Sequence, residues 1–417
     1  MRKSNTNISP LNLISTEIKK IYKSKETHID ELEINGNFIP RFTDEFWTSK
    51  QRQNNPLHEI SYRACFKAEL PRFFIHLFTK AGDVVYDPFA GRGTTIIEAA
   101  LLGRNVISND INPLSKILSE PRLSIPSFSM IEERLKQINF NEKLKAEIDL
   151  SMFYHQDTEA EIVSLKNYLI EISKSGKADN IDRWIRMVAT NRLTGHSKNF
   201  FSVYTLPPNQ ALSPDRQKKI NKERNQKPGY KDVKKIILKK TSDLTKGIND
   251  RLIQKLKVID QKAKFYSLDA RETKPIRSNS VKLTVTSPPF LDVVNYRDDN
   301  WLRCWFNDID TEEIANKINI SKKLPDWEQV MGGVFKELYR ITKENGWVAF
   351  EVGEVKKGKV KLDEHIVPLG FQAGFKCEGI IINLQNFTKT ANIWGIKNNQ
   401  IGTNTNRIVL FRKSNSI

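Results

Sequence analysis

Apolar and polar positions recur along this chain with two different periods, and the change of period predicts an α/β fold. Residues 66–78 carry apolar side chains at helical spacing, and a short apolar run at 83–86 predicts a strand. A glycine-containing turn follows at 87–95, and then a helix that Gly103 closes. A second strand is expected at 105–108. Strand, turn, helix and strand in this order form the βαβ unit of an open parallel sheet.

The same α/β pattern returns in the C-terminal third of the chain. Short apolar runs predict strands at 264–268 and 281–286, and an amphipathic helix is expected over 327–342. A further apolar strand follows that helix. Two β-like runs near the end, at 379–384 and 407–412, predict a closing hairpin.

The stretch between these two α/β parts has a different character. It contains helical patterns at 156–174 and 180–192 and then a loop-like stretch at 195–214. We therefore expect four regions, namely an N-terminal arm at 1–57, the first half of an α/β domain at 58–119, a basic helical insertion at 120–263, and the second half of the α/β domain at 264–417.

Composition narrows the class of protein. The chain has 417 residues, of which 39% are hydrophobic and 28% charged, so a sizeable core is expected. A formal net charge of +18 indicates a polyanionic partner, either nucleic acid or an anionic membrane surface. No apolar run reaches the length of a membrane span, and the first residues lack a signal-peptide core. Three widely separated cysteines (Cys65, Cys304, Cys377) fit a reducing cytoplasm, and six histidines without ligand spacing predict no metal site.

The positive charge is concentrated in the insertion. Residues 216–264 hold seventeen lysine or arginine residues against five acidic ones, which is two-thirds of the whole excess. We expect helices with one basic face that neutralises phosphates without reading sequence. A solvated lysine-rich face is the alternative for any single lysine. Base reading is then assigned to the preceding loop, with the candidates Asn191, Arg192, His196, Asn199 and Asn209.

The turn at 87–95, DPFAGRGTT, carries the first candidate site. Glycines let the backbone approach a ligand closely, and the following helix offers free N–H groups. The lysine of a phosphate-binding P-loop and the full GxGxxG are both missing, and Asp87 disfavours a pyrophosphate. Asp110, after the next strand, is placed to accept from ribose hydroxyls. These features predict a ligand with a sulfonium, an amino group and a ribose; a tight turn without a ligand is the alternative.

The second candidate site is the Thr-Ser-Pro-Pro-Phe turn at 286–290. Two prolines stiffen the turn and remove two N–H donors, so that Ser287 Oγ and the Pro288 carbonyl can accept hydrogen bonds from an exocyclic amine. Phe290 can stack on a flat base that has left its helix. Because an aryl amine is a poor nucleophile, two acceptors aimed at its hydrogens would direct its lone pair towards a methyl sulfonium. A proline-rich strand end with a core phenylalanine is the alternative.

Together these motifs resemble those of the amino-group DNA methyltransferases, which use S-adenosylmethionine. The family's first motif, DPFxGxGTT, matches 87–95, and its fourth motif, [DNS]PP[YF], matches 287–290. The serine form is typical of the N4-cytosine branch and the aspartate form of the N6-adenine branch. The resemblance covers about 58–118 and 264–412. It implies a Rossmann-like, seven-stranded methyltransferase sheet with a mostly helical inserted target-recognition region.

The resemblance also implies which residues act. Asp110 would take the ribose of the cofactor, Asp269 would take the adenine amino group, and Lys67 lies on the helix that closes over the cofactor in this family. The implied cofactor-binding residues are Lys67, Asp87, Pro88, Phe89, Ala90, Gly91, Gly93, Thr94, Thr95, Asp110, Ile111, Asp269 and Ala270, and the implied catalytic residues are Ser287, Pro288, Pro289 and Phe290. Two positions depart from the family's commoner pattern. Arg92 stands where a small residue is usual, and Phe290 keeps the stacking ring of the commoner tyrosine but lacks its hydroxyl.

The function that the resemblance implies is methyl transfer from S-adenosylmethionine to N4 of a flipped cytosine in double-stranded DNA, for restriction-modification in the cytoplasm. A cognate restriction endonuclease is a candidate partner, and monomer and dimer both remain open. Three alternatives stay beside it. They are methylation of adenine N6, methylation of an RNA base, and a non-catalytic DNA-binding protein with a vestigial fold.

Overall fold

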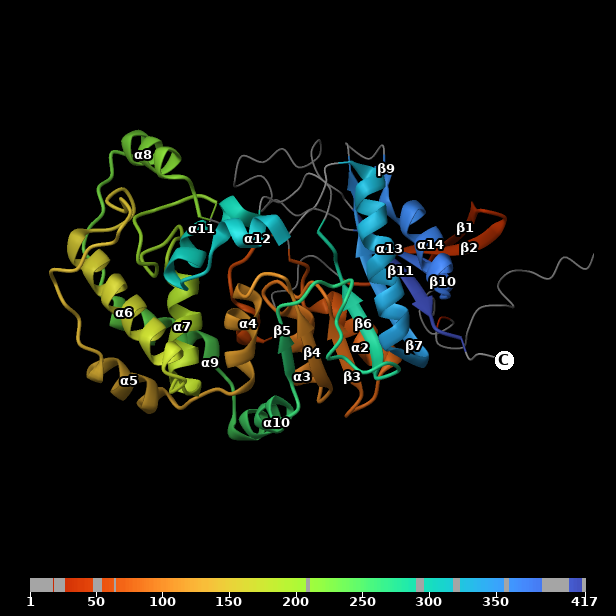
Figure 1. The fold of residues 1–417 in the computed structure, drawn as a ribbon, viewed down its shortest axis with the longest axis horizontal. Helices are drawn as coiled ribbons and strands as arrows, with labels where there is room; N and C mark the ends of the chain where they lie inside the picture. Colours follow the sequence, from red (N-terminus) through yellow and green to blue (C-terminus); the bar gives the residue numbers. More distant parts are fainter. Residues whose placement is uncertain are drawn as a thin grey trace, which may run out of the picture.

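The computed structural model describes residues 18, 27–47, 55–63, 65–207, 211–289, 296–317, 323–355, 360–384 and 405–414. In this part of the chain a nine-stranded sheet has the order β1-β2-β10-β11-β7-β6-β3-β4-β5, and helices cover both of its faces (Figure 1). Its strands are β1 (His28–Ile34), β2 (Asn37–Asp44), β3 (Val84–Asp87), β4 (Asn105–Asn109), β5 (Lys264–Tyr266), β6 (Val281–Thr286), β7 (Thr342–Val352), β10 (Lys376–Leu384) and β11 (Thr405–Arg412). A separate two-stranded sheet pairs β8 (Glu354–Val355) with β9 (Val360–Lys361).

The middle of the large sheet is parallel. Strands β5, β4, β3, β6 and β7 run side by side in one direction, and β11 is antiparallel to both β7 and β10. The predicted strands and the predicted closing hairpin are therefore present. Because β3 pairs with both β4 and β6, the two motif-bearing turns, which follow β3 and β6, lie at the same edge of the sheet.

The expected count of seven strands is wrong for this sheet. The N-terminal stretch, which we expected to be an extended arm, contains the hairpin of β1 and β2, and β2 extends the sheet by pairing with β10. The strand HIDELEI is half-exposed along its length, with no fully buried residue. Because this strand is mostly polar, a search for apolar runs does not predict it.

Helices pack on the two faces of the sheet in separate cores. They are α2 (Glu69–Phe78), α3 (Thr94–Leu101), α4 (Leu114–Ser119), α13 (Leu324–Ile341) and α14 (Leu362–Ala373), with the short 3-10 turns η2 (Pro56–His58) and η3 (Glu120–Leu123) nearby. The helices α11 (Tyr296–Phe306) and α12 (Thr311–Lys317) instead contact each other, and α11 contacts the insertion. Along β7, Trp347 and Ala349 join a core with α2 and α3, whereas Val348 and Phe350 join a core with α13 and α14. This alternation is the period of two expected for a strand buried on both faces.

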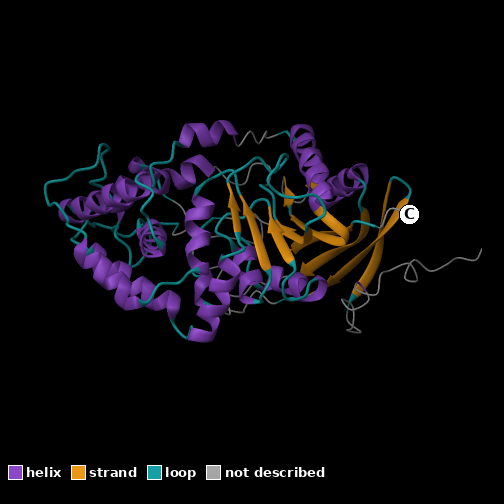
Figure 2. Cartoon of the chain, turned by 60° about the horizontal axis from the view of Figure 1, so that its bottom comes forward, coloured by secondary structure: helices purple, strands orange, loops and turns teal. Residues whose placement is uncertain are grey.

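The insertion is helical, and Figure 2 shows it as a purple mass beside the orange sheet. Its helices are α5 (Phe128–Gln137), α6 (Gln156–Lys174), α7 (Asn180–Arg192), α8 (Pro214–Glu223), α9 (Val233–Thr245) and α10 (Asp250–Asp260). The bounds of α6 and α7 are those that the apolar spacing predicts. Buried residues of α5, α7 and α9 belong to the same core as α2 and α3, so the insertion packs on the sheet domain. The predicted domain boundaries at 57, 119 and 263 stay predictions.

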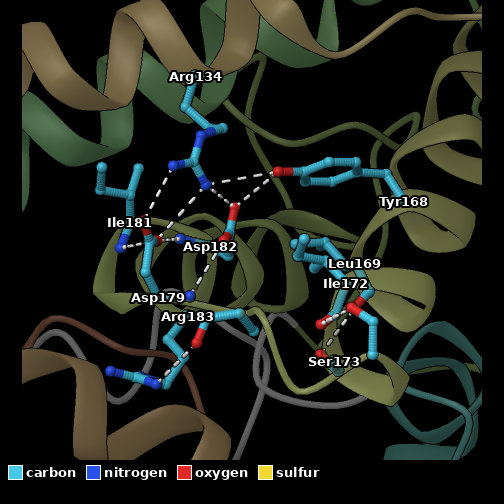
Figure 3. A network of polar contacts seen from close by, with 11 residues as sticks. Arg134, Tyr168, Leu169, Ile172, Ser173, Asp179, Ile181, Asp182 and Arg183 are labelled. Atoms are coloured by element: carbon cyan, nitrogen blue, oxygen red, sulfur yellow. Dashed lines mark hydrogen bonds and ion pairs between the residues drawn. The ribbon is translucent and has the colours of Figure 1, made fainter.

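A half-buried polar network fixes three insertion helices to one another (Figure 3). Arg134 of α5 binds Asp182 and, at 2.9 Å, Asp179, the residues that form the capping box of α7. Tyr168 of α6 donates to Asp182 at 2.9 Å. Although burial opposes ionisation, the hydrogen bonds hold the pKa of Asp179 below its ordinary value, and those to Asp182 and Asp179 raise the pKa of Arg134.

In the part of the chain that the structure describes, no helix is long and apolar enough to span a bilayer.

Candidate active site

A pocket lies at the carboxyl ends of β3, β4 and β6, and the two predicted motifs form much of its wall. The predicted residues that line it are Asp87, Pro88, Phe89, Ala90, Gly91, Thr94, Asp110, Ile111, Asp269, Ala270, Ser287, Pro288 and Pro289. Lys67, Gly93 and Thr95 are not among its lining residues, and Phe290 lies outside the described residues. The fold thus brings together segments that stand almost two hundred positions apart in the sequence.

The two glycines of the first motif have different surroundings. Gly91 (φ +50°) lines the pocket, and a side chain there would meet the ring of Tyr62. Gly93 (φ +79°) precedes α3, and a Cβ on it would lie only 2.5 Å from the Cβ of Ser119. Both φ values favour glycine. Gly93 is therefore required by packing against α4, and Gly91 by the backbone turn at the pocket.

Asp87 is a buried carboxyl at the end of β3. Its Oδ1 accepts from Thr286 Oγ1 at 2.6 Å and from the Phe89 N–H at 3.1 Å, and Thr95 also hydrogen-bonds to it. Burial nevertheless raises the pKa of Asp87 to about 7. A carboxyl with a pKa near neutral pH loses its proton readily when a positive charge enters the pocket. Asp87 is therefore suited to bind a cationic ligand.

Asp110 stands at the end of β4, next to the glycine turn. Its two oxygens accept from the backbone N–H groups of Gly91, at 2.8 Å, and Asn112, at 2.9 Å. Burial raises the pKa of Asp110 to about 6. The carboxyl is thereby fixed at the pocket wall, and each oxygen retains a lone pair for a hydroxyl donor.

Asp269 has a partner that the sequence did not indicate. Arg271 binds both of its oxygens, with Nη2 2.6 Å from Oδ2 and Nε 3.0 Å from Oδ1, and lowers the pKa of Asp269. The aliphatic part of the Arg271 side chain packs against Gly333 of α13. The carboxylate is therefore held in one orientation at the pocket.

The turn after β6 is held by neighbouring elements. Trp327 of α13 donates its ring N–H to the Pro289 carbonyl at 3.0 Å. The side chain of Ser287 hydrogen-bonds to Glu351, a buried carboxyl on the adjacent strand β7 whose pKa burial raises. Asn406 also donates to Glu351. When Glu351 is ionised it can only accept, so that Ser287 then donates to it and the lone pairs of Ser287 Oγ stay available as acceptors.

Several lining residues were missed by the sequence analysis. They come from the segment before α2, from the loop after β5, from α12 and from the pocket-facing side of α13, and they are Tyr62, Arg63, Cys65, Phe66, Leu268, Arg271, Lys317, Val330, Met331 and Val334. The spacing of Val330 and Val334 marked them as core residues of a helix. Apolar spacing does not distinguish a face that packs on a sheet from one that also borders a ligand pocket.

Arg92, the departure from the family pattern, holds the segment before α2. Its buried guanidinium donates to the carbonyls of Ile60, at 2.8 Å, His58, at 3.3 Å, and Phe66, at 3.5 Å. Arg122, also buried, donates to the carbonyl of Arg92 itself. Arg92, the residue between the two glycines, thus holds in place the segment before α2 that lines the pocket.

The expectation that each helix of the lysine-rich stretch has one basic face stays a prediction, but these helices do not lie together on one surface of the molecule. Helix α8 adjoins the region of α11, where Trp301 donates to the Leu212 carbonyl at 3.0 Å. Helix α10 instead packs at the far end of α3, where Lys255 donates to the Leu101 carbonyl at 2.7 Å. Figure 1 shows the two helices far apart, with α8 at the top and α10 at the bottom. Lys240 of α9 is buried, and burial lowers its pKa to about 8.

Two of the candidate base-reading residues are also corrected. Asn191 is buried and donates to the Ser61 carbonyl at 3.3 Å, and Arg192 is buried with its guanidinium 3.9 Å from the centre of the Phe200 ring. Both therefore serve packing. His196 and Asn199 are exposed and stay candidates, and Asn209 lies outside the described residues. Among the described residues, no cluster of histidine, cysteine or acidic side chains could hold a metal ion.

Comparison with known proteins finds one family model. Residues 7–118 match a model of N6/N4 methyltransferases described as DNA methylase. The Type II methyltransferase M.BsoBI of Geobacillus stearothermophilus is 28% identical over 193 residues, 37% of this chain and 38% of that protein. M.MjaI of Methanocaldococcus jannaschii is 42% identical over 62 residues, 15% of this chain and 20% of that protein. The chain thus spans less than two-fifths of these curated relatives.

Two further matches are a relative named as a tRNA methyltransferase and a solved structure. A tRNA (guanine(10)-N2)-dimethyltransferase of M. jannaschii is 28% identical over 132 residues, 31% of this chain and 36% of that protein. A structure of a DNA modification methylase from Thermus thermophilus, complexed with S-adenosyl-L-methionine, matches with a TM-score of 0.23 and 20% identity over 36% of this chain and 52% of that one. A TM-score this low carries no argument about function.

Proposed function

Since this chain belongs to the amino-group DNA methyltransferase family, with residues 7–118 matching its model, we propose that it transfers a methyl group from S-adenosylmethionine to the exocyclic N4 amine of a cytosine in duplex DNA. The observation that supports this most is the hydrogen bond between Thr286 and Asp87. It joins the strand that carries the Ser-Pro-Pro turn to the strand that carries the glycine turn, so both motifs line one pocket.

The cofactor of this family, S-adenosylmethionine, supplies a methyl group on a positively charged sulfonium. The pocket fits such a ligand, because Asp87 and Asp110 are carboxyls whose pKa values burial has raised towards neutrality. Asp87 would face the positively charged part, Asp110 the ribose hydroxyls, and Asp269 the adenine amino group. Arg271 holds Asp269 in the orientation for that contact.

The protein's own part in the reaction is to orient the amine. Ser287 Oγ and the Pro288 carbonyl accept from its two hydrogens, which turns its lone pair away from the ring system and towards the pocket. The bond from Ser287 to Glu351 fixes the hydroxyl hydrogen and makes the oxygen a stronger acceptor. The methylated amine carries an excess proton, and the Ser287 hydroxyl is placed to take it while its own hydrogen passes to Glu351.

The target base must leave the double helix to reach this pocket, because the amine is paired inside the duplex. Phe290, outside the described residues, would stack on the extruded base. The net charge of +18 supplies the attraction to phosphates. Cytosine is preferred to adenine because the motif has serine at 287. A cognate restriction endonuclease remains a candidate partner, and the cytoplasm is the expected location.

The experiment is mass spectrometry of nucleosides from duplex DNA incubated with the protein and S-adenosylmethionine, beside a Ser287→Ala variant. We expect N4-methylcytosine from the wild type and little from the variant. N6-methyladenine would retain the mechanism and correct the base. A product only on transfer RNA would favour the second candidate, an RNA base methyltransferase, which the similarity to the tRNA dimethyltransferase supports.

A further inference from the structure

The short segment formed by residues 57–63, 65 and 66 contacts three parts of the molecule at once. It precedes α2, and its residues Tyr62, Arg63, Cys65 and Phe66 line the pocket. From the glycine turn, Arg92 donates to carbonyls of this segment, and Arg122 donates to the Leu57 carbonyl at 2.8 Å. Both arginines are buried. The cofactor side of the pocket and this segment therefore form one rigid unit.

The other side of the segment is bound by the insertion and by α11. Asn191 of α7 and Arg303 of α11 both donate to the Ser61 carbonyl, at 3.3 and 3.1 Å. The guanidinium of Arg303 also lies 5.6 Å from the centre of the Tyr62 ring. Helix α11 is the first helix after the Ser-Pro-Pro turn, so these bonds connect the segment with the part of the chain that follows the catalytic turn.

One ion pair in this contact lies at the pocket itself. Arg63 Nη1 is 2.9 Å from both carboxylate oxygens of Asp299. The Asp299 side chain is 6% exposed and the Arg63 side chain 37% exposed, so the pair reaches from the protein interior to the pocket wall. The backbone carbonyl of Asp299 accepts from the Ala211 N–H at 3.0 Å, in the stretch that leads into α8.

The far end of α11 is tied to the insertion as well. Arg186 of α7 donates to the side chain of Asn307 at 2.7 Å and to its carbonyl at 2.9 Å. Asn307 in turn donates to Thr190 at 2.9 Å. A small movement of the insertion relative to the sheet would therefore be carried by α11 as a whole to Asp299, since packed helices move as rigid bodies.

We propose that Asp299 is a positioning residue that acts through Arg63, and that this ion pair couples the affinity for S-adenosylmethionine to the binding of duplex DNA at the insertion. The inference rests on the proposed function and goes beyond it. Arg63 lines the pocket, while Asp299 accepts from Ala211 before α8 and lies on α11, the helix after which Asn307 is bonded to α7. Coupling between two sites is reciprocal, so DNA tightens cofactor binding by the same factor by which the cofactor tightens DNA binding.

The test measures the dissociation constant of S-adenosylmethionine by calorimetry, without and with a saturating duplex oligonucleotide. The oligonucleotide carries the site that the wild type methylates, found by sequencing plasmid DNA modified by the enzyme. We expect DNA to tighten cofactor binding by about fivefold or more in the wild type. In Asp299→Asn, Arg63→Ala and the double variant, this factor should fall close to one, with no further loss in the double variant.

The control is Asp30→Asn, which breaks the Arg41–Asp30 pair on the β1–β2 hairpin, away from the pocket. It should leave the factor unchanged. If Asp299→Asn weakens cofactor binding equally with and without DNA, or if the wild type has no coupling, the proposal is wrong. If the wild type methylates no DNA, sequencing of the plasmid will show no modified site. That result would contradict the proposed function, and it is distinct from a result that contradicts the coupling.

Discussion

Thr286 donates its hydroxyl hydrogen to Asp87 over 2.6 Å, although 199 positions separate the two residues in the sequence. The bond connects the ends of the adjacent parallel strands β6 and β3. It lies inside the pocket wall, where Asp87 has few other donors to stabilise its charge. Asp87 therefore keeps a pKa of about 7 in spite of this bond, because burial opposes ionisation more strongly than Thr286 favours it.

The first prediction concerns the pH dependence of cofactor binding. A cationic ligand requires ionised Asp87, so its affinity should fall as the pH drops below about 7, by up to about tenfold per pH unit. Asp87→Asn should bind more weakly at pH 8 and lose this dependence. Calorimetry from pH 5.5 to 8.5 measures both. An unchanged pH dependence in the variant would place the titrating group elsewhere.

The same carboxyl affects stability with the opposite sense of pH. Its pKa in the folded protein is raised above the ordinary value of 3.8, so its stabilising contribution is present below that value and is lost as the pH rises to about 7. Without ligand, Asp87→Asn should therefore become more stable relative to the wild type between pH 4 and 7. Urea unfolding across that range provides the measurement.

A second prediction concerns Glu351, which does not line the pocket. Glu351→Gln should lower kcat by roughly one to two orders of magnitude, because Ser287 loses its charged acceptor, and should leave the KM for S-adenosylmethionine almost unchanged. Steady-state kinetics separates the two parameters. Glu344→Gln, an exposed site on the same strand, is the matched control. An unaltered kcat in Glu351→Gln would remove Glu351 from the mechanism.

Arg92 provides a third prediction. Arg92→Ser introduces the family's commoner type of residue but leaves the carbonyls of His58, Ile60 and Phe66 without this donor. We expect roughly tenfold weaker cofactor binding or worse, and a loss of about 1–3 kcal/mol in the free energy of unfolding. Calorimetry and urea unfolding test this. Arg104→Ser, which removes a similar bond to the Thr79 carbonyl, should cost stability without affecting the cofactor.

The separation of α8 from α10 leads to a fourth prediction. Changing Lys218, Lys219 and Lys222 of α8 to glutamine should reduce the slope of log affinity for DNA against log salt by about 2–3. The same charge change at Arg251, Lys257 and Lys262, in and after α10, should have little effect. Fluorescence anisotropy with a labelled duplex measures both slopes. Equal losses would mean that overall charge, and not α8, attracts the DNA.

A fifth prediction tests the network between the insertion helices. Asp182→Asn removes the charge of one partner of Arg134, and the loss of this part-buried, charged hydrogen bond should cost about 1–3 kcal/mol in the free energy of unfolding. Glu132→Gln removes an exposed pair with Lys136 on the same helix as Arg134 and should cost less than about 0.5 kcal/mol. Urea denaturation compares them. Comparable costs would show that the network contributes little.

The sequence predicted the elements whose local signals agree with their environment. The strands β3 and β6 are apolar runs that end in the two motifs, β4 is a run that ends just before Asp110, and α6 and α7 show helical spacing over their full length. In these elements burial and period point to the same structure. The motif residues that line the pocket could be predicted for the same reason, since each follows such a strand.

What could not be predicted depends on contacts distant in the sequence. No local signal shows that Arg92 holds the segment before α2, or that Arg271 holds Asp269. In the hairpin of β1 and β2, the residues Leu32 and Ile34 that pack against the core stand among acidic residues in the sequence. The place of the hairpin beside β10 depends on pairing more than three hundred positions away. The positive charge of the lysine-rich stretch could be read from the sequence. The separation of its basic residues between α8 and α10 could not, because it depends on the packing of α10 against α3.

The position of β6 between β3 and β7 also determines when the pocket can first be completed during synthesis of the chain. At about 5–20 residues per second, the ribosome adds the 199 positions from Asp87 to Thr286 in roughly 10–40 seconds. During that interval β3 has no β6 beside it, and the pocket has only one of its two motif-bearing walls. A nascent or prematurely ended chain that lacks β6 can therefore carry the complete glycine motif and most of the basic charge, and still lack the pocket wall formed by the Ser-Pro-Pro turn.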